Sequence, residues 1–134
     1  MPRSDRLRIA GVVFVFLWFF IGGIAHFAAT DTEMRIVPPY IPWPRTTVVV
    51  TGVFELLGAL GVIRAWSRPV AGAGLLLLTL AVTPANVYML QRWDQFPIPY
   101  WALVLRLPLQ VALLVVIAWS TEVRSLRFQR TRHV

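Results

Sequence analysis

Apolar residues in this chain gather into long runs that are separated by arginine, proline and acidic residues. The first run extends from Ile9 to Ala29 and contains 21 residues, of which His26 alone is strongly polar. A helix of this length is about 30 Å long at ~1.5 Å per residue, which matches the hydrocarbon core of a bilayer. The whole pattern predicts four transmembrane helices, over residues 8–29, 46–63, 69–91 and 100–121.

A cleaved signal peptide is the competing interpretation of the first run. A signal peptide has an apolar region of about 7–15 residues, followed by a cleavage site of small residues. The first run is longer than that, and no A-x-A sequence closes it. We therefore expect a retained first helix, preceded by a short basic head over residues 1–8.

The segment between the first two predicted helices, residues 30–45, is rich in proline towards its end. Proline removes a backbone donor and disfavours helical geometry in the residue before it, so this segment cannot be helical throughout. It also carries Tyr40 and Trp43, and such aromatic residues are enriched where a membrane meets water. Two interpretations stay open: a segment that lies at the membrane interface, or a stiff connector.

Composition agrees with the pattern of apolar runs. Of the 134 residues, 57% are hydrophobic and 14% are charged, whereas charged residues make up about 25% of a typical soluble domain. The chain is too short for a separate soluble domain beside four spans. We predict an all-α membrane protein, with one four-helix bundle over residues 1–134 that ends in a basic tail over residues 122–134.

The positive charge of the chain is arranged as in a membrane protein. A net charge of +7 alone would also suit a nucleic-acid-binding protein, but the arginines cluster at the ends of the apolar runs, where they meet lipid headgroups. Nine of them fall on one predicted side of the membrane: Arg3, Arg6, Arg8, Arg64, Arg68, Arg124, Arg127, Arg130 and Arg132. The positive-inside rule then puts both termini in the cytoplasm, and we expect no nucleic-acid partner.

Five strongly polar residues interrupt the apolar runs: His26, Glu55, Asn86, Arg106 and Gln110. At 1.5 Å per residue, they lie about 5, 14, 8, 9 and 15 Å from the non-cytoplasmic ends of their helices. All five therefore belong to the outer half of the bilayer or to its midplane. Ionisable residues inside a membrane are costly and mark functional sites by default. We expect one polar pocket that opens outward, with the carboxylate of Glu55 at its centre.

Helical spacing supports a pocket inside the bundle. Arg106 and Gln110 are four residues apart and share a helix face. Gly52 and Gly58 lie on the same face as Glu55, and small residues mark faces where membrane helices approach closely. We expect Arg106 to be the counter-charge of Glu55. Secondary candidates for the pocket are Thr51, Thr83 and Tyr88.

The same residues also have a purely structural interpretation. Buried polar side chains often only link membrane helices by hydrogen bonds, and Glu55 with Arg106 would then be a satisfied internal ion pair. Pro84 and Pro108 each free a backbone carbonyl that could face a ligand, and each could equally produce a simple kink.

The sequence contains no recognisable catalytic motif, so no catalytic residue is assigned. It has no HExxH sequence and no glycine-rich phosphate loop. The absence of cysteine excludes disulfides, thiol catalysis and thiolate metal sites. One histidine and one glutamate are weak evidence for a metal, and we expect no metal site.

The order of several short motifs resembles the DoxX-like family of small bacterial membrane proteins. These motifs are IGGIAHF, PPYIP, FELLGALG, PANVYM and RLPLQ, and the similarity extends over about residues 8–120. The resemblance implies four transmembrane helices in the bacterial inner membrane. Some relatives are named for a subunit of a thiosulfate:quinone oxidoreductase, and others accompany redox or maturation enzymes.

Two main hypotheses of function follow. In the first, a redox-associated subunit holds a quinone or similar small amphiphile with the five polar residues; Glu55 exchanges a proton and Arg106 stabilises an anionic form. An oxidoreductase subunit would be its partner. In the second, the protein is a non-enzymatic scaffold or assembly partner, and its polar residues are structural. A transporter is a third alternative, which would require a homo-oligomer to form a translocation path.

Overall fold

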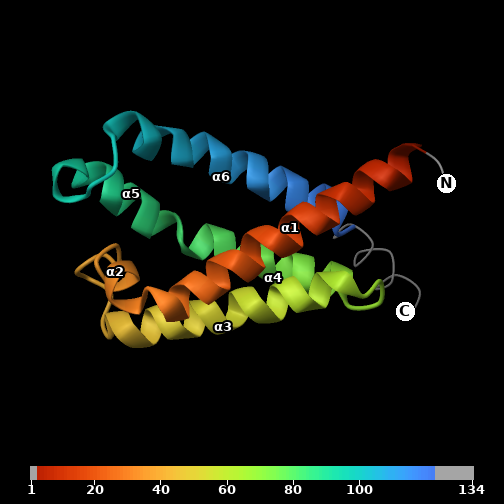
Figure 1. The fold of residues 1–134 in the computed structure, drawn as a ribbon, viewed down its shortest axis with the longest axis horizontal. Coiled ribbons are helices and arrows are strands. Elements are labelled where there is room, and N and C mark those ends of the chain that lie inside the picture. The colour runs from red at the N-terminus through yellow and green to blue at the C-terminus, as the bar shows by residue number, and fades with distance from the viewer. Residues whose placement is uncertain (1–2, 123–134) are drawn as a thin grey trace, which may run out of the picture.

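The structure, a computed structural model, describes residues 3–122, so the predicted basic tail lies outside the described residues except for Glu122. This part of the chain is helical and contains no strand. Its elements are α1 (Arg3–Ala28), α2 (Thr30–Met34), α3 (Pro44–Ile63), α4 (Arg68–Ala81), α5 (Thr83–Gln91), the short 3-10 helix η1 (Trp93–Gln95) and α6 (Tyr100–Ser120) (Figure 1).

Four helical stretches are long and apolar enough to cross a membrane, as the sequence predicts: α1, α3, α4 with α5, and α6. The first stretch begins earlier than expected. Residues of the basic head already belong to α1, and Asp5 in its first turn has the charge that a helix N-terminus favours.

The third stretch is broken at Val82, which separates α4 from α5. Pro84 explains the break, because it has no backbone N–H and its ring clashes with the carbonyl four residues earlier. The new helix therefore starts with this proline in its first turn.

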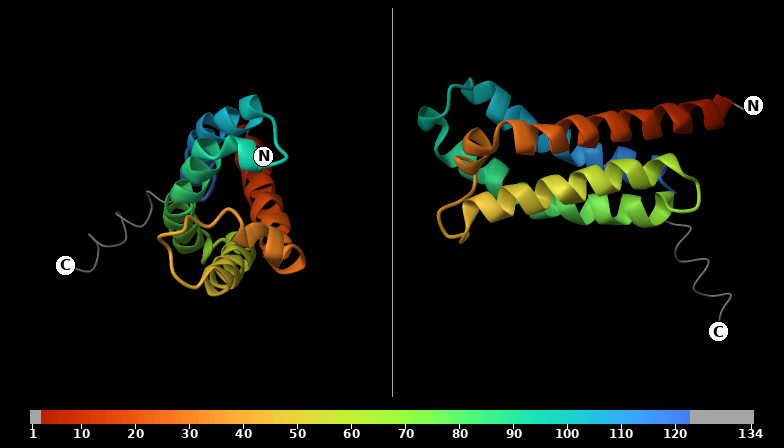
Figure 2. Two further views of the ribbon diagram at one scale, coloured as in Figure 1. Left: turned by 90° about the vertical axis from the view of Figure 1, so that its left-hand side faces the viewer. Right: turned by 60° about the horizontal axis from the view of Figure 1, so that its bottom comes forward.

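The helices form a bundle whose two ends differ. We call the end with α2 and η1 distal, and the end with Arg3, Glu122 and the turn between α3 and α4 proximal. α1 packs along α3, α3 packs along α4, and α6 contacts α1, α4 and α5. α5 and the first turns of α6 diverge from α1 and α3 towards the distal end (Figures 1 and 2).

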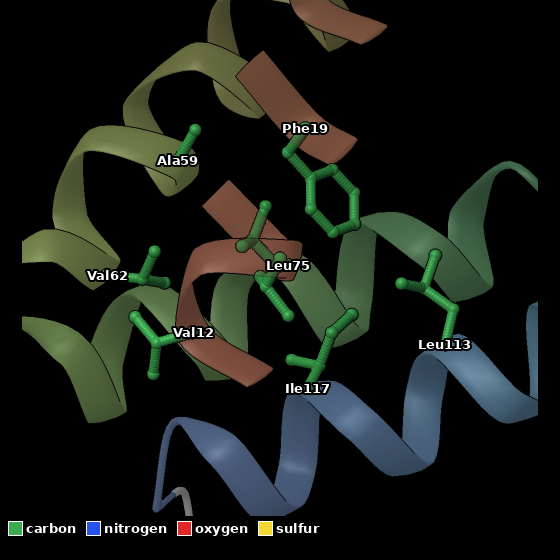
Figure 3. Packing of buried hydrophobic residues seen from close by; sticks show 8 residues of the cluster. Val12, Phe19, Ala59, Val62, Leu75, Leu113 and Ile117 are labelled. Carbon is green, nitrogen blue, oxygen red and sulfur yellow. The ribbon is translucent and has the colours of Figure 1, made fainter. Parts of the chain in front are cut away.

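A cluster of buried apolar residues occupies the proximal half of the bundle. Phe19, Ala59, Leu75 and Ile117 come from four different helices and are all at most 3% exposed (Figure 3). Gly58 allows α3 to approach α4 here, because a Cβ at this position would lie 2.7 Å from Leu75 Cγ. Close packing of this kind is the main source of helix association in a bilayer.

The outer surface of the bundle is apolar, as expected for helices that face lipid. Large exposed side chains include Ile21, Leu57, Leu77 and Val115, each at least 59% exposed. The proline-rich connection between α2 and α3 is turn-like, and its Tyr40 and Trp43 are about three-quarters exposed. Exposed aromatic residues next to a span are suited to a membrane interface.

Candidate functional site in the distal half of the bundle

The polar residues of α1 and α3 continue the faces that form the core. His26 is seven residues after Phe19, and Glu55 is four and seven residues before Ala59 and Val62. Residues at these spacings lie on one side of an α-helix. Each helix therefore presents an apolar face to the bundle interior in the proximal half and an ionisable group on the same face in the distal half.

The other two spans repeat this arrangement. On α6, Gln110 and Arg106 are three and seven residues before the buried Leu113. On α5, Asn86 is three residues before the buried Met89. Four of the five polar residues predicted for the site, namely His26, Glu55, Asn86 and Gln110, are thus partly buried on interior faces in the distal half, and Arg106 is exposed at the edge of such a face.

His26 and Glu55 form the ionisable pair of the site. Nδ1 of His26 lies 3.0 Å from Oε2 of Glu55 and 2.8 Å from the carbonyl oxygen of Gly22. The carbonyl is in line to accept the Nδ1 proton, whereas Oε2 is buried at ion-pair distance without a well-aligned hydrogen bond. A carboxylate and an imidazole this close can share or exchange a proton.

Glycines allow this pair to form between two closely packed helices. A Cβ on Gly52 would lie 2.8 Å from the Cβ of His26, and a Cβ on Gly22 would contact both carboxylate oxygens of Glu55. The predicted close approach on the face of Glu55 therefore occurs, with α1 at Gly52 and with α4 at Gly58.

A second polar cluster links α4, α5 and α6. Asn86 Nδ2 donates a hydrogen bond of 2.6 Å to Gln110 Oε1. Gln110 Nε2 in turn donates to the hydroxyl of Thr83 and to the carbonyl of Thr79, the latter at 3.2 Å. This carbonyl is four residues before Thr83, beside the break between α4 and α5, so Gln110 supplies a donor where the helix is interrupted.

Arg106 differs from the other four residues because its side chain is exposed, although it lies on the interior face of α6. Its Nη1 lies 3.3 Å from the thioether sulfur of Met89, a weak acceptor. Among the described residues, Arg106 has no carboxylate within ion-pair distance. A guanidinium at this depth therefore keeps donors free for another anion.

These contacts correct the expected pairing of Glu55. Its basic partner is His26 and not Arg106, because α3 packs on α1 while Arg106 turns towards α5. The five residues form two clusters on two pairs of helices. The depths estimated from helix ends differ by about 9 Å between His26 and Glu55. The two residues are nevertheless in contact, because α3 begins beyond the distal end of α1.

Of the three secondary candidates for the site, one belongs to the second polar cluster and two belong to neither cluster. Thr83 belongs to the cluster of Asn86 and Gln110. Thr51 donates within its own helix, to the carbonyls of Thr47 and Val48, and Tyr88 packs edge-on against Phe96 of the distal loop. Thr79 and Met89 were not predicted as site residues; Thr79 shares the Thr83 face, which was the available signal.

The ionisable pair is more accessible than the core residues that continue its helix faces. The side chains of His26 and Glu55 are 17% and 13% exposed, whereas Ala59 and Val62 on the same face of α3 are fully buried. Two cavities, of about 330 and 410 Å³, lie at the proximal and distal ends of the bundle, and none of the five polar residues lines either. The described residues hold no group of three potential metal ligands.

The fold and this site together define a multi-pass membrane protein whose bundle interior carries ionisable groups. The chain matches the family described as a domain of unknown function (DUF8561) over residues 15–124, and it therefore belongs to that family. The match includes all five polar residues. Neither a curated protein nor a solved structure matches the chain.

Proposed function

We propose that this protein binds a small amphiphile that can exchange a proton, such as a quinone, between the two helix pairs in the distal half of the bundle. The observation that carries the proposal is the His26–Glu55 pair, which lies on the interior faces of α1 and α3 and is partly accessible. An ion pair kept inside a membrane is costly. Apolar residues would pack the same positions at less cost, so a role in ligand or proton exchange accounts for the pair.

Each polar group has a role in such a site. Glu55 and His26 exchange a proton with an oxygen of the ligand. Arg106, which has free donors, stabilises the anionic form of the ligand. The amide cluster of Asn86 and Gln110 holds α5 against α6, so it fixes the part of α6 that carries Arg106.

The location of the site follows from the arginine distribution. With both termini in the cytoplasm, the distal half faces away from the cytoplasm, and the ligand would enter from that side or from the outer leaflet. The bacterial inner membrane and an oxidoreductase partner subunit are part of this proposal through the resemblance to the DoxX-like family. A homo-oligomer is compatible with the apolar outer surface.

One observation favours the alternative of a scaffold or assembly partner. His26 lies at ion-pair distance from Glu55, and Asn86 donates to Gln110, so the polar layer could serve only to fix the packing of the helices. Under this alternative the same substitutions change stability or partner recovery without affecting ligand binding.

Titration of the purified protein in lipid nanodiscs with a short-chain ubiquinone analogue tests the proposal. Tryptophan fluorescence quenching reports binding, and we expect Glu55→Gln and Arg106→Gln each to weaken it at least about tenfold, the loss of one charge-assisted contact. Arg45→Gln is the matched control, because Arg45 pairs with Asp31 on the exposed distal surface. Equal affinity in all four proteins, or no saturable binding to the unchanged protein, would remove the proposal.

A further inference from the structure

The cavity at the proximal end has the chemistry of a site for one phospholipid molecule. It has a volume of about 330 Å³ and lies between α1, the end of α3 and the start of α4. Charged side chains line it at the helix ends: Asp5, Arg8, Arg68 and Glu122. The remaining lining residues are apolar, so the cavity is polar at one end and apolar at the other.

The apolar part of the cavity runs into the membrane. Along α1, the lining continues from Arg8 through Val12 and Val13 to Phe16, a distance of about 12 Å at 1.5 Å per helical residue. Val13 is half exposed, as is Ile63 on the opposite wall, so the cavity opens to the lipid-facing surface. An amphiphile with its head at the level of Arg8 would place an acyl chain along these residues.

The two arginines in the charged part of the cavity keep hydrogen-bond donors that are free for a ligand. Arg8 donates to Glu122 at 2.8 Å through Nη1, so its Nη2 is left for a ligand. Arg68 donates to the carbonyls of Val62 and Ile63 through Nε and Nη2, so its Nη1 is left for a ligand.

Asp5 supplies the opposite sign. It has no ion-pair partner among the described residues. The four charged residues of the described lining sum to zero, two arginines against two carboxylates. A head with one negative and one positive group matches this arrangement better than a purely anionic head does.

We propose that the proximal cavity binds a phospholipid with an ethanolamine head. Its phosphate accepts hydrogen bonds from Arg8 and Arg68, and its primary ammonium donates to Asp5. A choline head carries the same charges, but its quaternary nitrogen has no N–H to donate. A glycerol head leaves Asp5 facing a net negative lipid. This site is separate from the ligand site of the distal half and does not depend on it.

Native mass spectrometry of the delipidated full chain tests the proposal. The protein is titrated with phosphatidylethanolamine, phosphatidylglycerol and phosphatidylcholine that have identical acyl chains. We expect the ethanolamine lipid to be retained at least about fivefold more than the other two, since one charge-assisted hydrogen bond distinguishes it. Equal or stronger retention of phosphatidylglycerol would overturn the proposal and indicate general attraction of anionic lipid to the basic ends.

Two substitutions locate the site. Asp5→Asn should abolish the preference for ethanolamine over choline, whereas Asp31→Asn, the same change at the distal end, should leave it intact. Arg68→Gln should weaken binding of all three lipids, because all carry a phosphate, and leave their ratio unchanged. A preserved ethanolamine preference in Asp5→Asn, or unchanged binding of every lipid in Arg68→Gln, would contradict the assignment.

Discussion

The His26–Glu55 contact can be tested by a double-mutant cycle on stability. The two side chains face each other at 3.0 Å and are mostly buried, and each belongs to a different helix. The substitutions are His26→Leu, Glu55→Leu and the two together, which remove the polar groups without creating new hydrogen bonds.

The two single substitutions should differ in cost. With Glu55→Leu, His26 keeps the carbonyl of Gly22 as an acceptor at 2.8 Å. With His26→Leu, the carboxylate of Glu55 loses its one basic partner, and Oε2 is already buried without an aligned donor. Leaving a buried charge unpaired costs more than removing it. We therefore expect His26→Leu to be the more destabilising, and addition of Glu55→Leu to restore part of the loss.

The magnitude follows from the environment of the pair. Interhelical hydrogen bonds in membrane proteins contribute about 0.6 kcal/mol on average and up to ~1.7 kcal/mol, and hydrogen bonds to charged groups contribute about 1.5–3 kcal/mol. We expect a coupling free energy of roughly 1–2 kcal/mol between His26 and Glu55. A second cycle with Arg106→Leu should give a coupling to Glu55 below about 0.5 kcal/mol, because the two residues share no contact.

Unfolding by sodium dodecyl sulfate in mixed micelles measures these free energies, with circular dichroism and tryptophan fluorescence as the signals. Additivity of His26→Leu and Glu55→Leu within about 0.5 kcal/mol would refute the pairing. A larger coupling of Glu55 to Arg106 than to His26 would restore the interpretation that helical spacing alone suggests.

Two further predictions concern the packing of the bundle, measured by the same unfolding experiment. Gly72→Ala should cost about 1–3 kcal/mol by overpacking, because the new Cβ would lie 2.5 Å from Thr121 Cβ. The matched change Gly74→Ala meets no atom within 4 Å and should be neutral or stabilising by up to about 1 kcal/mol. Equal effects of the two substitutions would contradict this placement of α4. Gln110→Leu should cost about 1–3 kcal/mol, since it leaves the amide of Asn86 without its acceptor, and an unchanged midpoint would mean that this link between α5 and α6 does not contribute.

Much of the architecture could be predicted because it depends on local pattern. Apolar runs of bilayer length determine the spans, and the predicted 46–63 and 100–121 differ by at most two residues from α3 and α6. The break at Val82 within the predicted helix 69–91 was not predicted, since Pro84 permits either a continuous kinked helix or an interruption. The early start of α1 was missed because arginine-rich ends look like loops, although arginine is a good helix former.

The partners of the site residues could not be predicted from spacing. The sequence indicates which residues share a face of one helix, but not which helix lies opposite. Charge suggested Arg106 as the partner of Glu55, whereas packing of the glycines Gly22 and Gly52 brings α1 and His26 against α3. The relative depths of the residues also differ from the prediction, because the helices do not end at the same level. The conformation of α2 and the loops determines where each helix begins and ends.

The central claim is that the polar residues in the distal half of the bundle are accessible to water, whereas the apolar core around Ile117 is not. Because the chain contains no cysteine, single cysteines can be introduced on α6 without background. A membrane-impermeant maleimide should label Arg106→Cys in intact cells. It should not label Ile117→Cys, which lies in the buried core, or Val104→Cys, which lies on the opposite face of α6 towards lipid. Failure to label Arg106→Cys, or equal labelling at Val104, would contradict an accessible polar interior.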